Sequence, residues 1–263
     1  MKALSRLSVI LFTLCLILLS ISLPVLFIST SKSYYKNQFI KCNSYPDENE
    51  YLYVRYIDGD RNKTAKFTST QVDIIIEHIT DFLSDKKDSF ALQMNGVMLN
   101  GKTTNSVNIF SDESVEHMHD VKLLFLNIKH ITAFIFVIFV LLGIYIIFNR
   151  RKTKKYIFNY SLYSILGLVS AVILFLLFVI FKSGLSNFSF DTFFSILWEY
   201  MHYLFFPFSP DKFTGSFFND TLTMILNIDF FMNTVKIVVS ILCSSVTIWL
   251  VASFIIQKSF SKK

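Results

Sequence analysis

The chain has 263 residues, of which 53% are hydrophobic and 17% aromatic, and its formal net charge is +6. A mean hydropathy of +0.51 excludes an ordinary soluble domain and indicates a protein that uses the bilayer as its solvent. Ten basic residues lie beside the apolar runs without acidic neighbours, and the charge of the predicted extracytoplasmic parts is near-balanced, so no nucleic-acid partner is expected.

Four apolar runs reach the roughly 20 residues that a helix needs to cross a hydrocarbon core. The chain is therefore predicted to be a polytopic α-helical membrane protein with four transmembrane helices. Its predicted parts are transmembrane helix 1 at residues 1–28, an extracytoplasmic domain at 29–122 that leads into helix 2, transmembrane helix 2 at 123–148, a cytoplasmic loop at 149–155, transmembrane helix 3 at 156–181, an aromatic extracytoplasmic or interfacial segment at 182–232, transmembrane helix 4 at 233–257, and a cytoplasmic tail at 258–263.

Basic residues without acidic neighbours stand at both ends of the chain and in the 149–155 turn. The positive-inside rule places these parts in the cytoplasm, which gives an N-in, C-in topology. The first run follows Lys2 and Arg6, as in a signal peptide, but its apolar core is long and no small-residue cleavage site follows. We expect an uncleaved membrane anchor.

The extracytoplasmic domain is predicted to be a small α+β unit. Residues 51–67 alternate around a tight turn, which favours a β-hairpin. Residues 71–83 carry an apolar stripe at helical spacing, with Ser69 or Thr70 as the predicted cap. His78 lies within this stripe, and a lone histidine among apolar neighbours is more often structural than catalytic.

Residues 96–103 satisfy the phosphate-loop pattern GxxxxGK[ST] letter for letter. That loop binds phosphate because it opens a helix whose N-terminus faces the ligand. Here the following residues are polar and β-like, and Asn95-Gly96 and Asn100-Gly101 are strong turn dipeptides. The segment is interpreted as turns, with no nucleotide cofactor.

A helix is predicted to begin at Ser111 or Asp112 and to continue without a breaker to Phe148. Just before the membrane it carries a polar patch, which we define as Glu116, His117, Met118, His119, Asp120, Val121 and Lys122. His117 and Asp120 fall on one helix face, whereas His119 points elsewhere. Spacing alone leaves two interpretations open: a solvated helix cap with incidental histidines, or a functional site.

Residues 188–231 hold twelve phenylalanines, one tryptophan and two tyrosines. Aromatic residues at this density are typical of the lipid interface or of a site for an acyl chain. Residues 191–206 are predicted to form an interfacial helix, with Trp198, His202 and Phe205 on one side.

The polar patch and the aromatic segment together resemble the bacterial lipoprotein intramolecular transacylases (Lit). The first matching block is Phe110-Ser111, Glu116-His117-Met118, Asp120-Val121-Lys122, Leu124-Phe125 and Asn127. The second is His202, Leu204-Phe205-Phe206, Asp220-Thr221-Leu222 and Phe230-Phe231. Asn227 departs from the proline expected there, and the four spans extend the resemblance over nearly the whole chain.

This resemblance implies an acyltransferase (an O-to-N transacylase) that modifies lipoproteins. The sn-2 acyl chain of a diacylglyceryl-cysteine lipoprotein moves to the α-amino group of the same cysteine, which gives a lyso-form lipoprotein. The functional histidines carried over are His117 and His202. The implied partners are diacylglyceryl lipoproteins and membrane lipid, and the implied location is the bacterial plasma membrane, multi-pass, with the site on the extracytoplasmic side. We expect a monomer.

The residues suit this chemistry. An α-ammonium group with a pKa of about 8 must lose a proton before it attacks an ester, and the departing glycerol oxygen must gain one. Imidazole can do either near neutral pH. We expect His117, oriented by Asp120 or Glu116, to be the base and His202 to protonate the leaving oxygen, although the two roles can be reversed. No cofactor and no metal are expected. The predicted substrate-binding residues are Lys122, Trp198, Phe205 and Phe206.

Two rival interpretations remain. A metal site would use the acidic and histidine side chains Glu116, His117, His119, Asp120 and His202, but residues two apart on a helix face in different directions and no HExxH is present. A non-enzymatic membrane sensor or assembly subunit, which binds a partner through its extracytoplasmic domain, explains the topology equally well. It does not explain why titratable groups gather at one leaflet.

Overall fold

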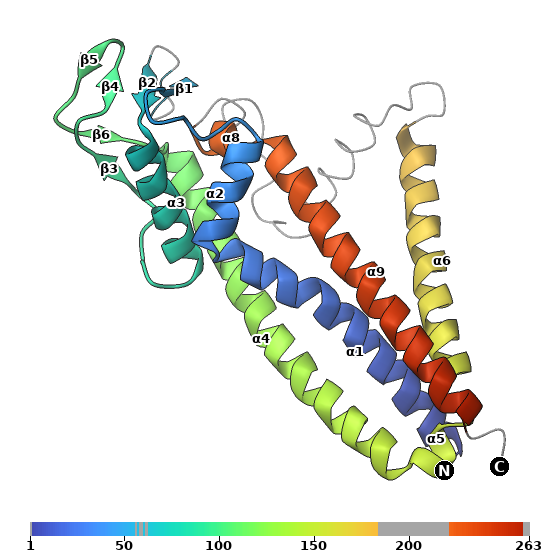
Figure 1. Cartoon of the computed structure of the whole chain (residues 1–263). Helices are drawn as coiled ribbons and strands as arrows, with labels where there is room; N and C mark the ends of the chain where they lie inside the picture. Colours follow the sequence, from blue (N-terminus) through green and yellow to red (C-terminus); the bar gives the residue numbers. More distant parts are fainter. Residues whose placement is uncertain (1, 56, 58–59, 61–62, 184–220, 260–263) are drawn as a thin grey trace. The chain divides into compact units, whose positions relative to one another are not determined.

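A computed structural model describes residues 2–55, 57, 60, 63–183 and 221–259. Its elements are α1 (Lys2–Ser29), α2 (Lys32–Lys41), β1 (Leu52–Arg55), β2 (Thr64–Phe67), α3 (Ser69–Leu83), β3 (Gln93–Met94), β4 (Met98–Leu99), β5 (Lys102–Thr103), β6 (Val107–Asn108), α4 (Asp112–Phe148), α5 (Arg150–Thr153), α6 (Ile157–Ser183), α8 (Thr221–Ile225) and α9 (Ile228–Ser259) (Figure 1). The predicted interfacial helix at residues 191–206 lies outside the described residues.

Four of the described helices, α1, α4, α6 and α9, are long and apolar enough to cross a membrane. Helices suit this environment because every backbone N–H and C=O within them is bonded internally. This confirms the predicted class of a polytopic helical membrane protein that also contains a small region of strands.

The chain divides into two compact units. The helical unit comprises residues 1–23, 129–207 and 238–263, and the mixed unit comprises residues 24–128 and 208–237. Within the helical unit, the ring of Phe12 stacks on Phe139 at 4.4 Å and lies 4.8 Å from Trp249. This contact joins α1 to both α4 and α9.

A polar cluster lies beside these rings in the helical unit. The indole N–H of Trp249 donates to the hydroxyl oxygens of Thr13 at 3.2 Å and Ser161 at 3.0 Å. The Thr13 hydroxyl also donates to Ser161 at 3.1 Å. Because lipid provides no hydrophobic drive between helices, hydrogen bonds of this kind help to hold α1, α6 and α9 together.

Two small antiparallel sheets form the β part of the mixed unit. One has the strand order β1-β2-β4-β5 and the other pairs β3 with β6. Val54 lies opposite Ala65 in the first sheet, which confirms the hairpin predicted for residues 51–67.

The phosphate-loop pattern lies in a tight hairpin between β4 and β5. Asn100 and Gly101 have φ angles of +47° and +81°, the left-handed conformations that the two central residues of a type I′ turn require. No helix follows Lys102 and Thr103, which form β5. The interpretation of this segment as turns is confirmed.

Helix α3 begins with a capping box. The Thr68 hydroxyl accepts from the backbone N–H of Gln71, and the Gln71 side chain accepts from the N–H of Thr68 at 2.9 Å. The prediction of Ser69 or Thr70 as the cap was therefore wrong, because the pair needs a Gln or Glu three residues after the cap.

The core of the mixed unit lies between α2, α3, α8, the strands and the start of α9. The predicted apolar stripe of α3 is buried in it: Val72, Ile75, Ile76, Ile79, Phe82 and Leu83. Phe230 at the start of α9 completes one side, with its ring 5.1 Å from Tyr35 and 6.0 Å from Phe39. This core supports the first turns of α4, to which the polar patch belongs.

Candidate active site

The polar patch is presented by the first turns of a single long helix. Helix α4 is 37 residues long, and the Ser111 hydroxyl caps it by accepting from the N–H of Ser114 at 3.2 Å. Asp112 and Glu113 occupy its first turn, where the helix dipole favours negative charge. The predicted start and continuation of this helix are confirmed.

The patch divides into two faces because successive residues turn by about 100° around a helix. Met118 and Lys122 lie on one face, 4% and 8% exposed respectively, and pack against the mixed unit. His117 and Asp120 fall on another face and are half-buried. Glu116 is exposed and lies at the edge of that second face.

His119 is exposed and flanks the packed face of α4 on the side away from His117. Its ring meets the ring of Phe82 edge-on at 5.2 Å between centroids. Phe82 is fully buried at the end of α3. This contact gives His119 a packing partner in the domain and directs it away from the face that carries His117.

Lys122, predicted to bind substrate, has its ammonium group engaged inside the protein. Its Nζ lies 2.8 Å from a carboxylate oxygen of Asp85 and donates to the backbone carbonyl of Lys87 at 2.8 Å. The same nitrogen lies 4.9 Å from the centroid of the Phe82 ring. These contacts support a role inside the fold.

The segment that receives Lys122 is the C-terminal cap of α3. The N–H of Asp85 donates to the carbonyl of Phe82, and the N–H of Lys86 donates to that of Asp81, which is the Schellman pattern. Asp85 has a φ of +65°. Glycine is usual at this position, since a side chain there costs about 1–2 kcal/mol, although Asp tolerates it better than most residues.

His78 is buried in the core, as expected for a structural histidine, and only 4% of it is exposed. Its Nε2 donates to the carbonyl of Phe90 at 2.9 Å, and its Nδ1 accepts from Nζ of Lys87 at 3.2 Å. Because a carbonyl only accepts and an ammonium group only donates, these contacts fix the neutral Nε2–H tautomer. Burial is the main cause that lowers the pKa of His78 below its usual range, and the nearby charge of Lys87 adds to it.

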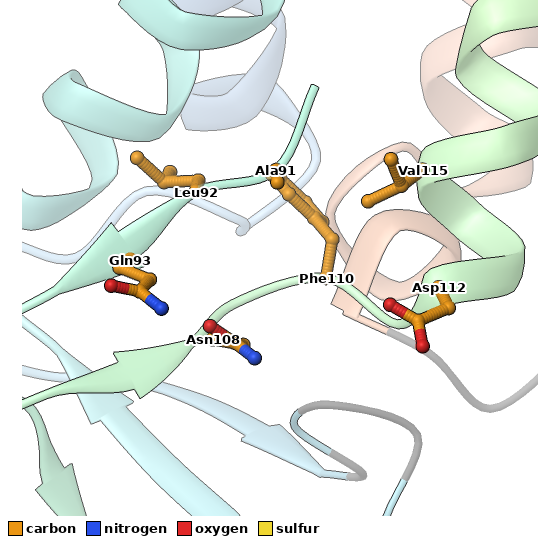
Figure 2. Close-up of a pocket in the computed structure, with 7 residues that line it drawn as sticks. All are labelled: Ala91, Leu92, Gln93, Asn108, Phe110, Asp112 and Val115. Atoms are coloured by element: carbon orange, nitrogen blue, oxygen red, sulfur yellow. The ribbon is translucent and has the colours of Figure 1, made fainter. Parts of the chain in front are cut away.

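A cavity of about 460 Å³ lies beside the start of α4 (Figure 2). Figure 2 shows Gln93 and Asn108 next to each other on the paired strands β3 and β6, with Asp112 and Val115 contributed by α4. By helical phase, Asp112 and Val115 belong to the side of α4 that also carries His119. The cavity therefore does not adjoin the face of His117, and we assign no chemical step to it.

The remaining predicted site residues, His202, Trp198, Phe205 and Phe206, lie outside the described residues. Among the residues that the structure does describe, no three His, Cys, Asp or Glu side chains gather as metal ligands would.

Sequence reasoning missed Phe82, Asp85 and Lys87 as neighbours of the polar patch. The detectable signal was the end of the apolar stripe at Leu83, which placed Ser84 and Asp85 at a helix terminus. Nothing in that signal pointed to Lys122.

Comparison with known proteins gives a consistent result. The family model described as lipoprotein intramolecular transacylase Lit matches residues 7–231, a stretch that contains both His117 and His202. Among solved structures, the chain is similar to the membrane integral lipoprotein intramolecular transacylase Lit from Bacillus cereus. That match has a TM-score of 0.63 and 15% identity and covers 100% of each chain, which establishes a shared fold. A search of curated proteins finds no match.

Proposed function

Because the chain belongs to the Lit family of lipoprotein intramolecular transacylases, we propose that it moves the sn-2 acyl chain of a diacylglyceryl-cysteine lipoprotein to the α-amino group of the same cysteine, with His117 as the base and His202 as the acid. The chain is an acyltransferase and a multi-pass bacterial membrane protein, which sets aside a purely non-enzymatic role. The product is a lyso-form lipoprotein.

The proposed reaction balances without a co-substrate. The α-ammonium group first loses one proton to bulk solvent, so that the neutral amine can attack the ester carbonyl. A base removes a second proton from nitrogen as the N–C bond forms. The C–O bond to glycerol then breaks, and the departing oxygen gains a proton. One imidazole that accepts and one that donates complete this transfer, and both suit neutral pH.

The observation that carries the proposal is the orientation of the polar patch on α4. Lys122 and Met118 hold one side of the helix against the mixed unit, whereas His117 and Asp120 belong to the other face. Asp120 follows His117 by three residues, so the carboxylate is placed to orient the imidazole. We assign Asp120 as the orienting residue and Glu116, at the edge of the face, as a supporting charge.

The lengths and charges of α4 and α5 support the proposal that His117 lies on the extracytoplasmic side. The helical rise of about 1.5 Å per residue separates His117 from Arg150 by about 50 Å, more than the roughly 30 Å of a hydrocarbon core. Arg150 and Arg151 begin the basic turn that the positive-inside rule assigns to the cytoplasm. His117 is thereby assigned to the opposite leaflet, where lipidated lipoproteins reside.

Trp198, Phe205 and Phe206 are proposed to hold the acyl chains of the substrate, because aromatic rings at the interface offer apolar area without charge. We propose a monomer that needs no cofactor. Lys122 is not included among the substrate contacts, since its ammonium group already has a carboxylate and a carbonyl as partners.

The test uses three single substitutions, His117→Ala, His202→Ala and His119→Ala, in cells that lack another source of the activity. The N-terminal state of a reporter lipoprotein is read by mass spectrometry. Loss of an acid or base is expected to slow conversion by about 10²–10⁴-fold, while His119→Ala retains most of it. Full conversion by the first or the second variant refutes that histidine's role.

A further inference from the structure

The cap of α3 and the polar patch of α4 are joined through Lys122. Its ammonium group bridges the carboxylate of Asp85 and the carbonyl of Lys87, each at 2.8 Å, and lies over the ring of Phe82. The side chain of Lys122 is 10% exposed and that of Asp85 is 52% exposed. All four residues belong to the mixed unit, so this contact lies within one compact body.

The backbone at Asp85 has a conformation that glycine adopts more readily, and the side chain present there contacts Lys122. The residue occupies the left-handed position of a Schellman cap, at φ +65°, where glycine would relieve the strain. Strain of this kind persists where the surrounding structure uses it. The use visible here is the contact of the Asp85 carboxylate with Lys122.

We propose that Lys122 is a positioning residue, which acts through Asp85 and Lys87 to fix the rotation of α4 and so aim His117 and Asp120 at the substrate. This inference rests on the proposed function. It assigns the charge of Lys122 to a contact within the protein and names Asp85 as the partner.

The required precision follows from helix geometry. Side-chain atoms on a helix lie about 5–6 Å from its axis, so a rotation of about 10° displaces an imidazole by about 1 Å. A misplacement of that size costs about 100-fold in rate. Lys122 follows His117 by five residues, about 7.5 Å along the axis, and its contacts are therefore close enough to control that rotation.

The experiment measures kcat and KM of the full-length protein in micelles with a diacylglyceryl lipopeptide. Lys122→Met and Asp85→Asn are each expected to lower kcat by about tenfold or more, with KM within about twofold. Their double variant is expected to be no slower than the slower single variant, because both remove the same contact. Lys122→Arg keeps a cation for the carboxylate and is expected to recover part of kcat.

Two further variants separate positioning from loss of folding. Asp85→Gly removes the ion pair but relieves the strained cap, so it is expected to lower kcat without lowering the unfolding temperature. Lys86→Met is the matched control: its exposed ammonium group pairs with Asp81 at 3.5 Å, and full activity is expected.

The outcomes are distinguishable. If Lys122→Met raises KM while both Asp85 variants keep normal kinetics, Lys122 binds substrate directly and the positioning role is overturned. Normal kcat in Asp85→Gly and Asp85→Asn overturns it also, even if Lys122→Met fails to fold. Absence of lyso-form product from the unsubstituted protein refutes the proposed function instead.

Discussion

The buried histidine of α3 predicts how stability depends on pH. His78 is neutral in the folded protein because Nε2–H bonds the carbonyl of Phe90 and Nδ1 faces the ammonium group of Lys87. The ring also packs against Phe90 and Phe110, and Asp81 is the acidic group that acts on it. A proton on Nδ1 would break the Lys87 contact and place two cations together in a buried site.

The lowered pKa of His78 determines whether the protein gains or loses stability as the pH falls. The unfolded chain takes up a proton near the usual pKa of about 6.5, whereas the folded protein resists until a lower pH. The stabilisation that the neutral His78 side chain gives the folded protein is therefore fully present above about pH 6.5. It is lost as the pH falls through the pKa of His78 in the folded protein. Within that window, the free energy of unfolding falls by up to about 1.4 kcal/mol per pH unit.

The assay is thermal unfolding of the full-length protein in micelles between about pH 7.5 and pH 5.5, a range set by the usual pKa of histidine. One kcal/mol corresponds to about 2–4 °C for a protein of about 150–250 residues, the size class nearest to this chain. His78→Gln is the matched variant, since an amide can donate to Phe90 and accept from Lys87 without taking up a proton. Lys87→Met should narrow the pH range over which stability is lost, because the charge of Lys87 helps to lower the pKa of His78. An equal loss of stability toward acid in wild type and His78→Gln would refute this reasoning.

Two smaller changes test other parts of the account. Trp249→Phe removes the indole donor to Thr13 and Ser161 and should lower the free energy of unfolding by about 1–2 kcal/mol. Denaturant unfolding in micelles measures this change, and an unchanged free energy would show that these hydrogen bonds do not hold the helices together. Gly101→Ala should cost about 1 kcal/mol because φ is +81° there, and unchanged stability would contradict the turn assignment.

The membrane-spanning helices were predictable because lipid allows few solutions. An apolar run of about 20 residues must satisfy its own backbone, so composition and length alone identify a helix. Helix α4 illustrates this, since its start at Asp112 and its end at Phe148 both follow from the sequence. The β4–β5 turn was also predictable, because it depends on the local sequence: Asn-Gly favours left-handed backbone angles.

The partners of the polar patch were not predictable, because they come from distant parts of the chain. Helical phase separates His119 from His117, but only tertiary packing places Phe82 against His119 and Asp85 against Lys122. The position of Lys122 near His117, which we propose as catalytic, suggested a substrate contact. The fold instead uses that charge to tie α4 to the end of α3.

The central claim is that His117 and His202 act together on one substrate, and an experimental structure with a bound diacylglyceryl lipopeptide analogue tests it most directly. The measurement is the distance from each imidazole to the reacting groups. The account predicts one imidazole nitrogen about 2.6–3.2 Å from the α-amino nitrogen and the other equally close to the glycerol ester oxygen. Imidazoles more than about 10 Å apart, with no shared cavity between them, would contradict it.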